Sequence, residues 1–130
     1  MKIISAVPLL LVAFGASAAI AATATPNDRA FVAKVSQGGM FEVAAGKLAE
    51  TRGSTQDVRD FATAEVHDHT LVGDKLKAIS SSEGVTFAAT PNAEFAGKLS
   101  RLSALSGKAF DAAYLSEMAT LHDGDGAAFA

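Results

Sequence analysis

Apolar and small residues recur at helical spacing through most of this chain, and this repeat constrains the fold more than any other feature. One seam consists of Phe31, Val35, Gly38, Glu42, Ala45 and Ala49. A second consists of Val58, Ala62, Glu65, His69, Val72, Leu76 and Ile79. Steps that alternate between 3 and 4 residues place these side chains on one helix face. No stretch after the N-terminal segment sustains the period of two that a half-buried strand requires, so we expect an all-α fold.

Capping residues and chain breakers divide this pattern into three long helices and one short helix. The predicted helices run from the Thr25-Pro26 cap to about Arg52, from a Ser54 or Thr55 cap to about Ser80, from the Thr90-Pro91 cap through Leu105, and from Gly107 to the Gly124-Asp125-Gly126 stretch. Short connectors favour an antiparallel bundle. Two adjacent helical glycines, Gly38 and Gly39, predict a kink or a close helix contact, because each costs about 1 kcal/mol relative to alanine.

The N-terminus has the pattern of a cleavable secretory signal peptide. Lys2 precedes an apolar run over residues 3–14, and small residues follow up to Ala22. The run is too short for a transmembrane helix, which needs about 20 apolar residues. Cleavage after Ala18 or after Ala21 fits the small-x-small rule. We therefore expect a signal peptide over residues 1–21, a helical domain over residues 22–130, and an exported protein that is periplasmic or associated with the outer membrane.

Composition excludes several classes of protein. The chain has no cysteine, so disulfides, thiolate metal sites, iron–sulfur clusters and cysteine nucleophiles are excluded. Its formal net charge is −3, and loss of Lys2 would leave 10 basic against 14 acidic residues, which disfavours nucleic acid as a partner. No second long apolar run follows the signal peptide, so we expect no integral membrane span in the mature chain. Any metal ligands must be His, Asp, Glu or Met.

Ionisable residues within the two apolar seams predict a metal site. Glu65 and His69 are spaced i, i+4 on one face of the second helix and can converge on one ion. Glu42 occupies an equivalent position in the first helix, and His122 lies at the edge of the apolar face of the last helix. Asp68 adjoins His69 and could join the site or orient the imidazole ring.

The predicted ligand set is therefore Glu42, Glu65, Asp68, His69 and His122. Mixed carboxylate and imidazole ligands suit iron, zinc, copper or nickel, and the sequence does not choose among them. The alternative is a metal-free structural or interaction protein of the cell envelope, in which these groups satisfy one another, with the Tyr114 hydroxyl as a further partner. Nucleophile elbows and glycine-rich phosphate loops are absent from the sequence, so no catalytic residue is predicted.

Several phrases of the sequence resemble a bacterial exported family of unknown function, often labelled predicted outer membrane protein and grouped with ferritin-like four-helix bundles. The most specific of these phrases are Asp68-His69-Thr70 and Phe110-Asp111-x-x-Tyr114, and the resemblance spans residues 28–129. It implies a ferritin-like bundle in the envelope. The polar positions that match are Glu42, Asp68, His69, Asp111, Tyr114 and His122. Glu65 departs from the pattern, which prefers an apolar residue there.

The resemblance also implies a further helix, because similar proteins continue beyond the position of Phe129. We therefore expect an incomplete bundle that exposes an apolar face, and a homo-oligomer could complete it. The chain contains no Glu-x-x-His motif, so a ferritin-type di-iron centre cannot be assembled from this chain alone. Asp111 is expected to stabilise the N-terminus of its own helix.

Overall fold

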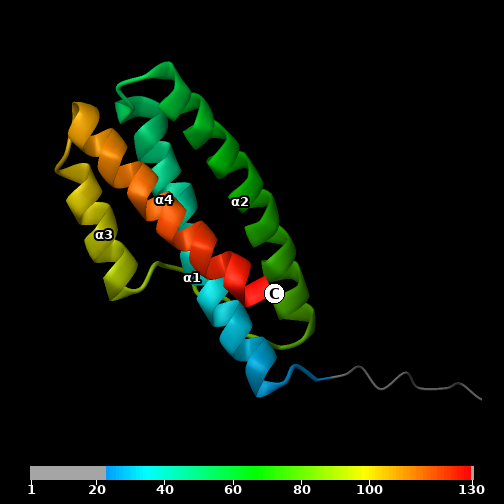
Figure 1. The fold of residues 1–130 in the computed structure, drawn as a ribbon. Helices are drawn as coiled ribbons and strands as arrows, with labels where there is room; N and C mark the ends of the chain where they lie inside the picture. Colours follow the sequence, from blue (N-terminus) through cyan, green and yellow to red (C-terminus); the bar gives the residue numbers. More distant parts are fainter. Residues whose placement is uncertain (1–22, 130) are drawn as a thin grey trace, which may run out of the picture.

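Four helices form the fold, as expected for an all-α bundle. The computed structural model describes residues 23–129, and the predicted signal peptide at residues 1–21 lies outside them. Helix α1 spans Pro26–Arg52, α2 spans Gln56–Ser82, α3 spans Ala93–Ser103 and α4 spans Gly107–Phe129. Successive helices run in opposite directions (Figure 1). No strand occurs among the described residues.

Two of the three predicted caps are observed. Thr25 forms a capping box with Asp28, in which each side chain accepts a hydrogen bond from the other residue's backbone N–H. Thr55 caps α2 through its side-chain oxygen. The predicted Thr90 cap is wrong, because Asn92 caps α3 and the helix begins at Ala93. The end of α4 differs from the prediction, because the helix continues through Gly124 and Gly126 to Phe129. A glycine lowers helix propensity by about 1 kcal/mol but does not forbid helical geometry.

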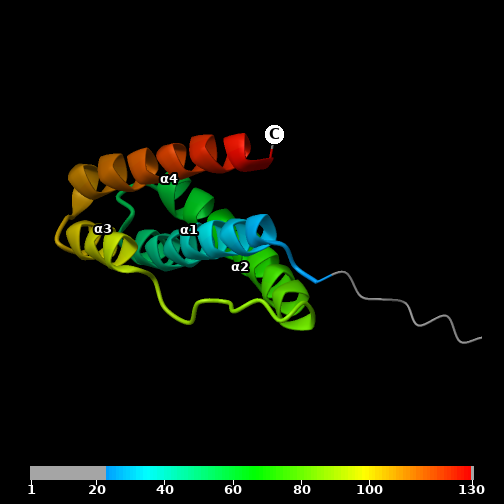
Figure 2. The ribbon, with the colours of Figure 1, turned by 90° about the horizontal axis from the view of Figure 1, so that it is seen from below.

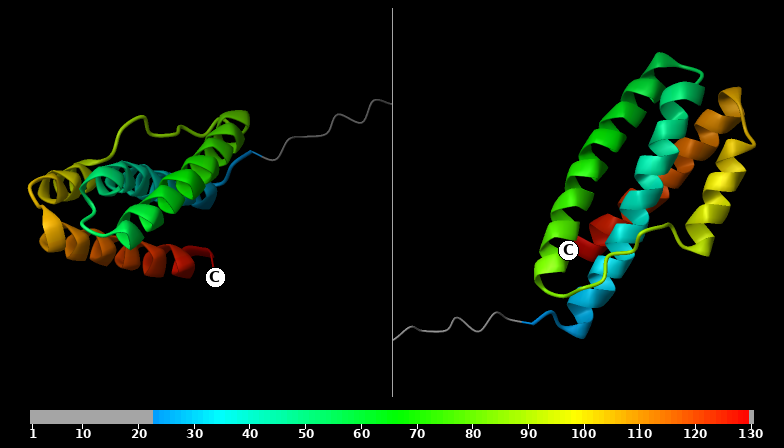
Figure 3. Two further views of the ribbon diagram at one scale, coloured as in Figure 1. Left: turned by 90° about the horizontal axis from the view of Figure 1, so that it is seen from above. Right: turned by 180° about the vertical axis from the view of Figure 1, so that it is seen from behind.

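Helix α1 is the central element, with α2, α3 and α4 packed around it. Figure 2 shows that α4 lies on one side of α1, and that the connector between α2 and α3 lies on the other. The view from above in Figure 3 shows the same arrangement. The main buried core consists of Phe41, Ala45, Ala49, Val58, Ala62, Leu102, Phe110, Tyr114 and Met118. This core therefore joins all four helices in the half of the bundle nearest the α1–α2 turn.

The second predicted seam is buried only in its first half. Val58, Ala62 and Glu65 are buried, as the helical spacing predicts. Further along α2, however, Val72 is 48% exposed and Ile79 is 61% exposed. The expectation that these two residues lie in the core is wrong, because α4 does not cover this part of α2.

Helices α1 and α2 pack closely at Gly46, a position where the sequence did not predict a contact. A Cβ atom added to Gly46 would lie 2.7 Å from Val66 Cγ2 and 3.3 Å from the Ala62 carbonyl oxygen. At Gly39, in contrast, an added Cβ would meet nothing within 4 Å, and α1 continues through Gly38 and Gly39 as a helix. Gly46 is therefore the position where the absence of a side chain allows two helices to pack closely.

Asp111 links two parts of the fold instead of capping its own helix. Its carboxylate accepts a 3.0 Å hydrogen bond from the Ser54 backbone N–H and a second one from the Ser54 hydroxyl. These two hydrogen bonds lower the pKa of Asp111 below its usual value. The expectation for Asp111 is corrected accordingly: it ties α4 to the turn between α1 and α2.

A pair of glycine substitutions tests the close contact. We expect Gly39→Ala to raise the free energy of unfolding by about 0.5–1 kcal/mol, because alanine is the better helix former and the space is open. Gly46→Ala should lower it, because overpacking of about 1–3 kcal/mol outweighs the same helix gain. Urea denaturation measures both. In a Val66→Ala background, the cost of Gly46→Ala should largely disappear, and an unchanged cost would contradict the close contact.

Candidate metal centre

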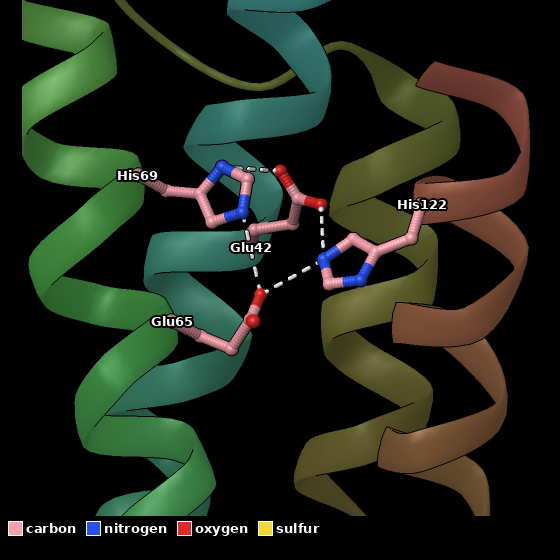
Figure 4. Close-up of side chains that lie close together, drawn as sticks. All are labelled: Glu42, Glu65, His69 and His122. Carbon is pink, nitrogen blue, oxygen red and sulfur yellow. Dashed lines mark hydrogen bonds and ion pairs between the residues drawn. The ribbon is translucent and has the colours of Figure 1, made fainter. Parts of the chain in front are cut away.

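Four of the predicted ligands come together where α1, α2 and α4 meet. Figure 4 shows Glu42 from α1, Glu65 and His69 from α2, and His122 from α4 pointing toward one another. One potential ligand atom from each residue lies within 4.8 Å of the others. We call these four residues the Glu/His cluster. The helical spacing of Glu65 and His69 positions two of the groups, and packing of the helices brings the other two from distant parts of the chain.

Close contacts connect the imidazole rings to the carboxylates. His69 Nδ1 lies 2.9 Å from Glu42 Oε2, and His69 Nε2 lies 3.3 Å from Glu65 Oε2. His122 Nε2 lies 3.1 Å from Glu65 Oε2 and 3.6 Å from Glu42 Oε1. The two imidazole rings stack with their centroids 5.9 Å apart. Each carboxylate is therefore contacted by both histidines.

Glu42 is the most constrained member of the cluster. Its side chain is 0% exposed, whereas the side chain of His69 is 23% exposed and that of His122 is 44% exposed. Neither Glu42 carboxylate oxygen makes a hydrogen bond with the described residues. The histidines approach these oxygens at ion-pair distance. Because an ionised carboxylate costs several kcal/mol to bury without compensation, an ionised Glu42 would need a positive charge next to it.

Three distances in the cluster are close to those around a single four-coordinate ion. With metal–ligand bonds of about 2.0–2.2 Å, tetrahedral geometry separates neighbouring ligand atoms by about 3.3–3.6 Å. The contacts of His122 Nε2 with Glu65 Oε2 and Glu42 Oε1 and of His69 Nε2 with Glu65 Oε2 are 3.1, 3.6 and 3.3 Å. Two carboxylates and two neutral imidazoles would also neutralise a divalent ion.

The structure places Asp68 outside the cluster. Its side chain is 77% exposed, and it lies 3.5 Å from His67, whose side chain is 63% exposed. Residues adjacent on a helix point about 100° apart, so Asp68 cannot accompany His69 into the interior. The cluster therefore includes Glu65, which departs from the family pattern, and lacks Asp68, which matches it.

Tyr114 lies close to the cluster but does not stabilise it through a hydrogen bond. Its side chain is buried and packs against Phe61 and Phe110. Its hydroxyl makes no hydrogen bond with the described residues. Burial raises the pKa of Tyr114 above its usual value, and the negative charges of Glu65, Glu42 and Glu50 raise it further. The tyrosine partner considered in the metal-free interpretation is thus not observed.

Taken together, fold and cluster define a small all-α protein with a mixed carboxylate and imidazole site between three helices. The family described as "Domain of unknown function (DUF4142)" matches residues 13–130, and the chain belongs to this family. No curated protein and no solved structure matches the sequence significantly. Among the described residues, none of the helices combines the length and the hydropathy needed to cross a bilayer.

The ionisation of Tyr114 offers a test of the buried environment. The chain has 1 tyrosine and no tryptophan, so phenolate absorbance near 295 nm reports on Tyr114 alone. A raised pKa stabilises the fold fully below the unfolded-state value of about 10, and this contribution is lost as pH rises above it. In chelator-treated protein, we expect phenolate absorbance to appear only together with loss of helical circular dichroism. Ionisation near pH 10 with the helices intact would contradict the buried position.

Proposed function

We propose that this protein is an exported helical-bundle protein that binds one transition-metal ion through the Glu/His cluster. The buried Glu42 carboxylate carries the proposal, because no lysine or arginine among the described residues forms an ion pair with it and neither oxygen has a hydrogen bond. A divalent cation would compensate this charge while leaving both histidines neutral. The proposal assigns no catalytic step.

Zinc is the first metal to test. It binds imidazole nitrogen and carboxylate oxygen, most often in four-coordinate geometry. Iron, copper and nickel accept the same ligand types in other geometries. The i, i+4 pair on α2 would fix two ligands, and Glu42 and His122 would add one each from α1 and α4. A bound ion would therefore cross-link three helices.

Metal analysis combined with single substitutions tests this function. Protein purified without chelator should contain one metal ion per chain, and His69→Ala and Glu42→Gln should both lose it. His67→Ala is the matched control, because it removes an exposed histidine from the same helix and should retain the metal. Elemental analysis measures the stoichiometry. Removal and readdition of zinc to the wild type then shows whether binding is reversible.

Thermal unfolding with and without metal separates this function from a metal-free structural role. At a free zinc concentration of 100 times Kd, linkage should stabilise the wild-type protein by about 2.7 kcal/mol, and His69→Ala should show no such gain. If the cluster only satisfies itself, His69→Ala will lower Tm equally with zinc and with chelator. That result, together with no metal uptake by the wild type, would refute the proposed function.

A further inference from the structure

A cleft of about 900 Å³ lies between α1 and α2 and opens onto the Glu/His cluster. Its volume falls within the range of small-molecule sites, which is about 300–1,000 Å³. From Glu42 the lining continues along α1 to Val35, about two turns away. From His69 it continues along α2 to Leu76, again about two turns. We call this space the α1–α2 cleft, and the cluster forms part of its wall.

The Glu/His cluster is accessible from the α1–α2 cleft. Glu42, His69 and His122 line the cleft, whereas Glu65 does not. The His122 side chain is 44% exposed, and the Glu65 side chain is only 11% exposed. Zinc sites that bind a further molecule keep a coordination position open, whereas structural zinc sites are closed by their protein ligands. An ion held by these residues would face the cleft, so a molecule in the cleft can reach it.

Two glycines leave room for an apolar group beside the cluster. Gly39 of α1 and Gly73 of α2 both line the cleft, and a Cβ added to either would meet nothing within 4 Å. Gly73 follows His69 by about one turn, and helical side chains lean toward the N-terminus of their helix. A side chain at residue 73 would therefore enter the cleft close to His69. With glycine at this position, that volume is open to a ligand.

The connector between α2 and α3 covers one side of the cleft. Its residues 87–89 line the cleft, and Figure 3 shows the connector crossing α1 on its way to α3. Hydrogen bonds hold the connector against α1: Arg29 donates to the Gly84 carbonyl at 3.3 Å, and the Gln37 side chain donates to the Thr90 carbonyl at 3.3 Å. The cleft is thus walled by two helices and an anchored segment.

The lining of the cleft favours an uncharged ligand. Lys47 and Lys77 are balanced by Glu42 and Asp74, so the lining carries no net charge when the histidines are neutral. Glu42 and Glu65 would already neutralise a divalent ion in the cluster, and an anionic ligand would add an uncompensated negative charge beside them. A neutral donor avoids this cost. The apolar side chains of the lining are those of Val35, Met40, Val43, Val72, Leu76 and Phe87.

We propose that a metal ion in the Glu/His cluster takes one further ligand from the α1–α2 cleft, and that this ligand is an uncharged aromatic nitrogen base with an apolar ring. This binding rests on the proposed function, because the ion supplies the bond to the nitrogen. Imidazole-type nitrogen suits the same metals as the cluster does and brings no charge with it. The ring, lying in the space beside Gly73, adds affinity by leaving water. Binding is reversible, and no group is transferred.

Cobalt-substituted protein separates the two proposals, because Co²⁺ has visible absorption bands that change with its ligands. Adding Co²⁺ to metal-free wild type should produce bands that His69→Ala lacks. Adding benzimidazole should then change these bands saturably, with cobalt still bound after gel filtration. Absence of the bands in the wild type would overturn the proposed function and this inference together. Bands that benzimidazole leaves unchanged, or cobalt that it strips from the protein, would overturn this inference alone.

Matched small molecules test each contribution to binding. Indole has nearly the size of benzimidazole but lacks the coordinating nitrogen, imidazole lacks the apolar ring, and benzoate presents an anionic donor. Isothermal titration calorimetry with the cobalt protein should show each of them binding at least about tenfold more weakly than benzimidazole, which corresponds to about 1.4 kcal/mol. Equal affinity for indole would remove the metal from the interaction, and equal affinity for imidazole would remove the cleft. Either result, or equal affinity for benzoate, would overturn the proposal.

Filling the cleft with a protein side chain provides the last arm. Gly73→Leu should retain the cobalt bands and lower benzimidazole affinity at least about tenfold, with a smaller loss for imidazole. Gly124→Leu is the matched control, since Gly124 is also helical and open but lies outside the cleft. If Gly73→Leu loses cobalt, Gly39→Leu fills the same cleft from α1 and takes its place. Unchanged benzimidazole affinity in the variant that retains cobalt would place the ring elsewhere and refute the proposal.

Discussion

The contact between Gly46 and Val66 sets the relation between α1 and α2, and the rest of the structure depends on it. A Cβ at residue 46 would lie 2.7 Å from Val66 Cγ2, so the absence of a side chain there lets the two helices pack closely. Ala49, Val58 and Ala62 of the main core lie between this contact and the α1–α2 turn. Phe41 lies on the other side of the contact, where the core meets the Glu/His cluster.

Helical spacing and charge together explain why the Glu/His cluster forms where α1, α2 and α4 meet. Glu42 follows Phe41, and both are completely buried, so the carboxylate is held in a region that water does not reach. Helical spacing forces this outcome, because a seam that buries Ala45 and Ala49 also buries the residue one turn earlier. The two partly exposed histidines lie at ion-pair distance from both carboxylates. Protonation of both or coordination of a cation would neutralise the pair of carboxylates. Coordination achieves this without charging either imidazole.

The sequence predicts the helices well, because local interactions determine them. Capping residues such as Thr25 and Thr55 and the seam through Ala45 and Val58 suffice to place the helices within a few residues. They also suffice to propose Glu42, Glu65, His69 and His122 as a group, since each occupies the inner face of its helix. Asp68 is predicted as a ligand only because it adjoins His69, and the turn of the helix directs its side chain outward.

What the sequence does not predict depends on how the helices are placed relative to one another. Val72 and Ile79 continue the same spacing as Val58 and Ala62, yet no partner covers them, and periodicity carries no information about a missing neighbour. The bond from Ser54 to Asp111 joins residues 57 positions apart and depends on tertiary packing. Glycines show the limit most clearly: Gly46 permits a close contact and Gly39 leaves a space, although both are single glycines on the same helix.

Gly39 and Gly73 are not the residues that helix stability alone would favour. Alanine at Gly39 and Gly73 would favour the helices by about 0.5–1 kcal/mol each and would meet no steric barrier. Departures from the locally favourable residue are expected where function requires them. Both glycines line the same cavity between α1 and α2, which also reaches Glu42 and His69 of the Glu/His cluster. Larger side chains at these two positions would occupy part of this cavity, so the open space depends on residues that helix stability alone would not favour.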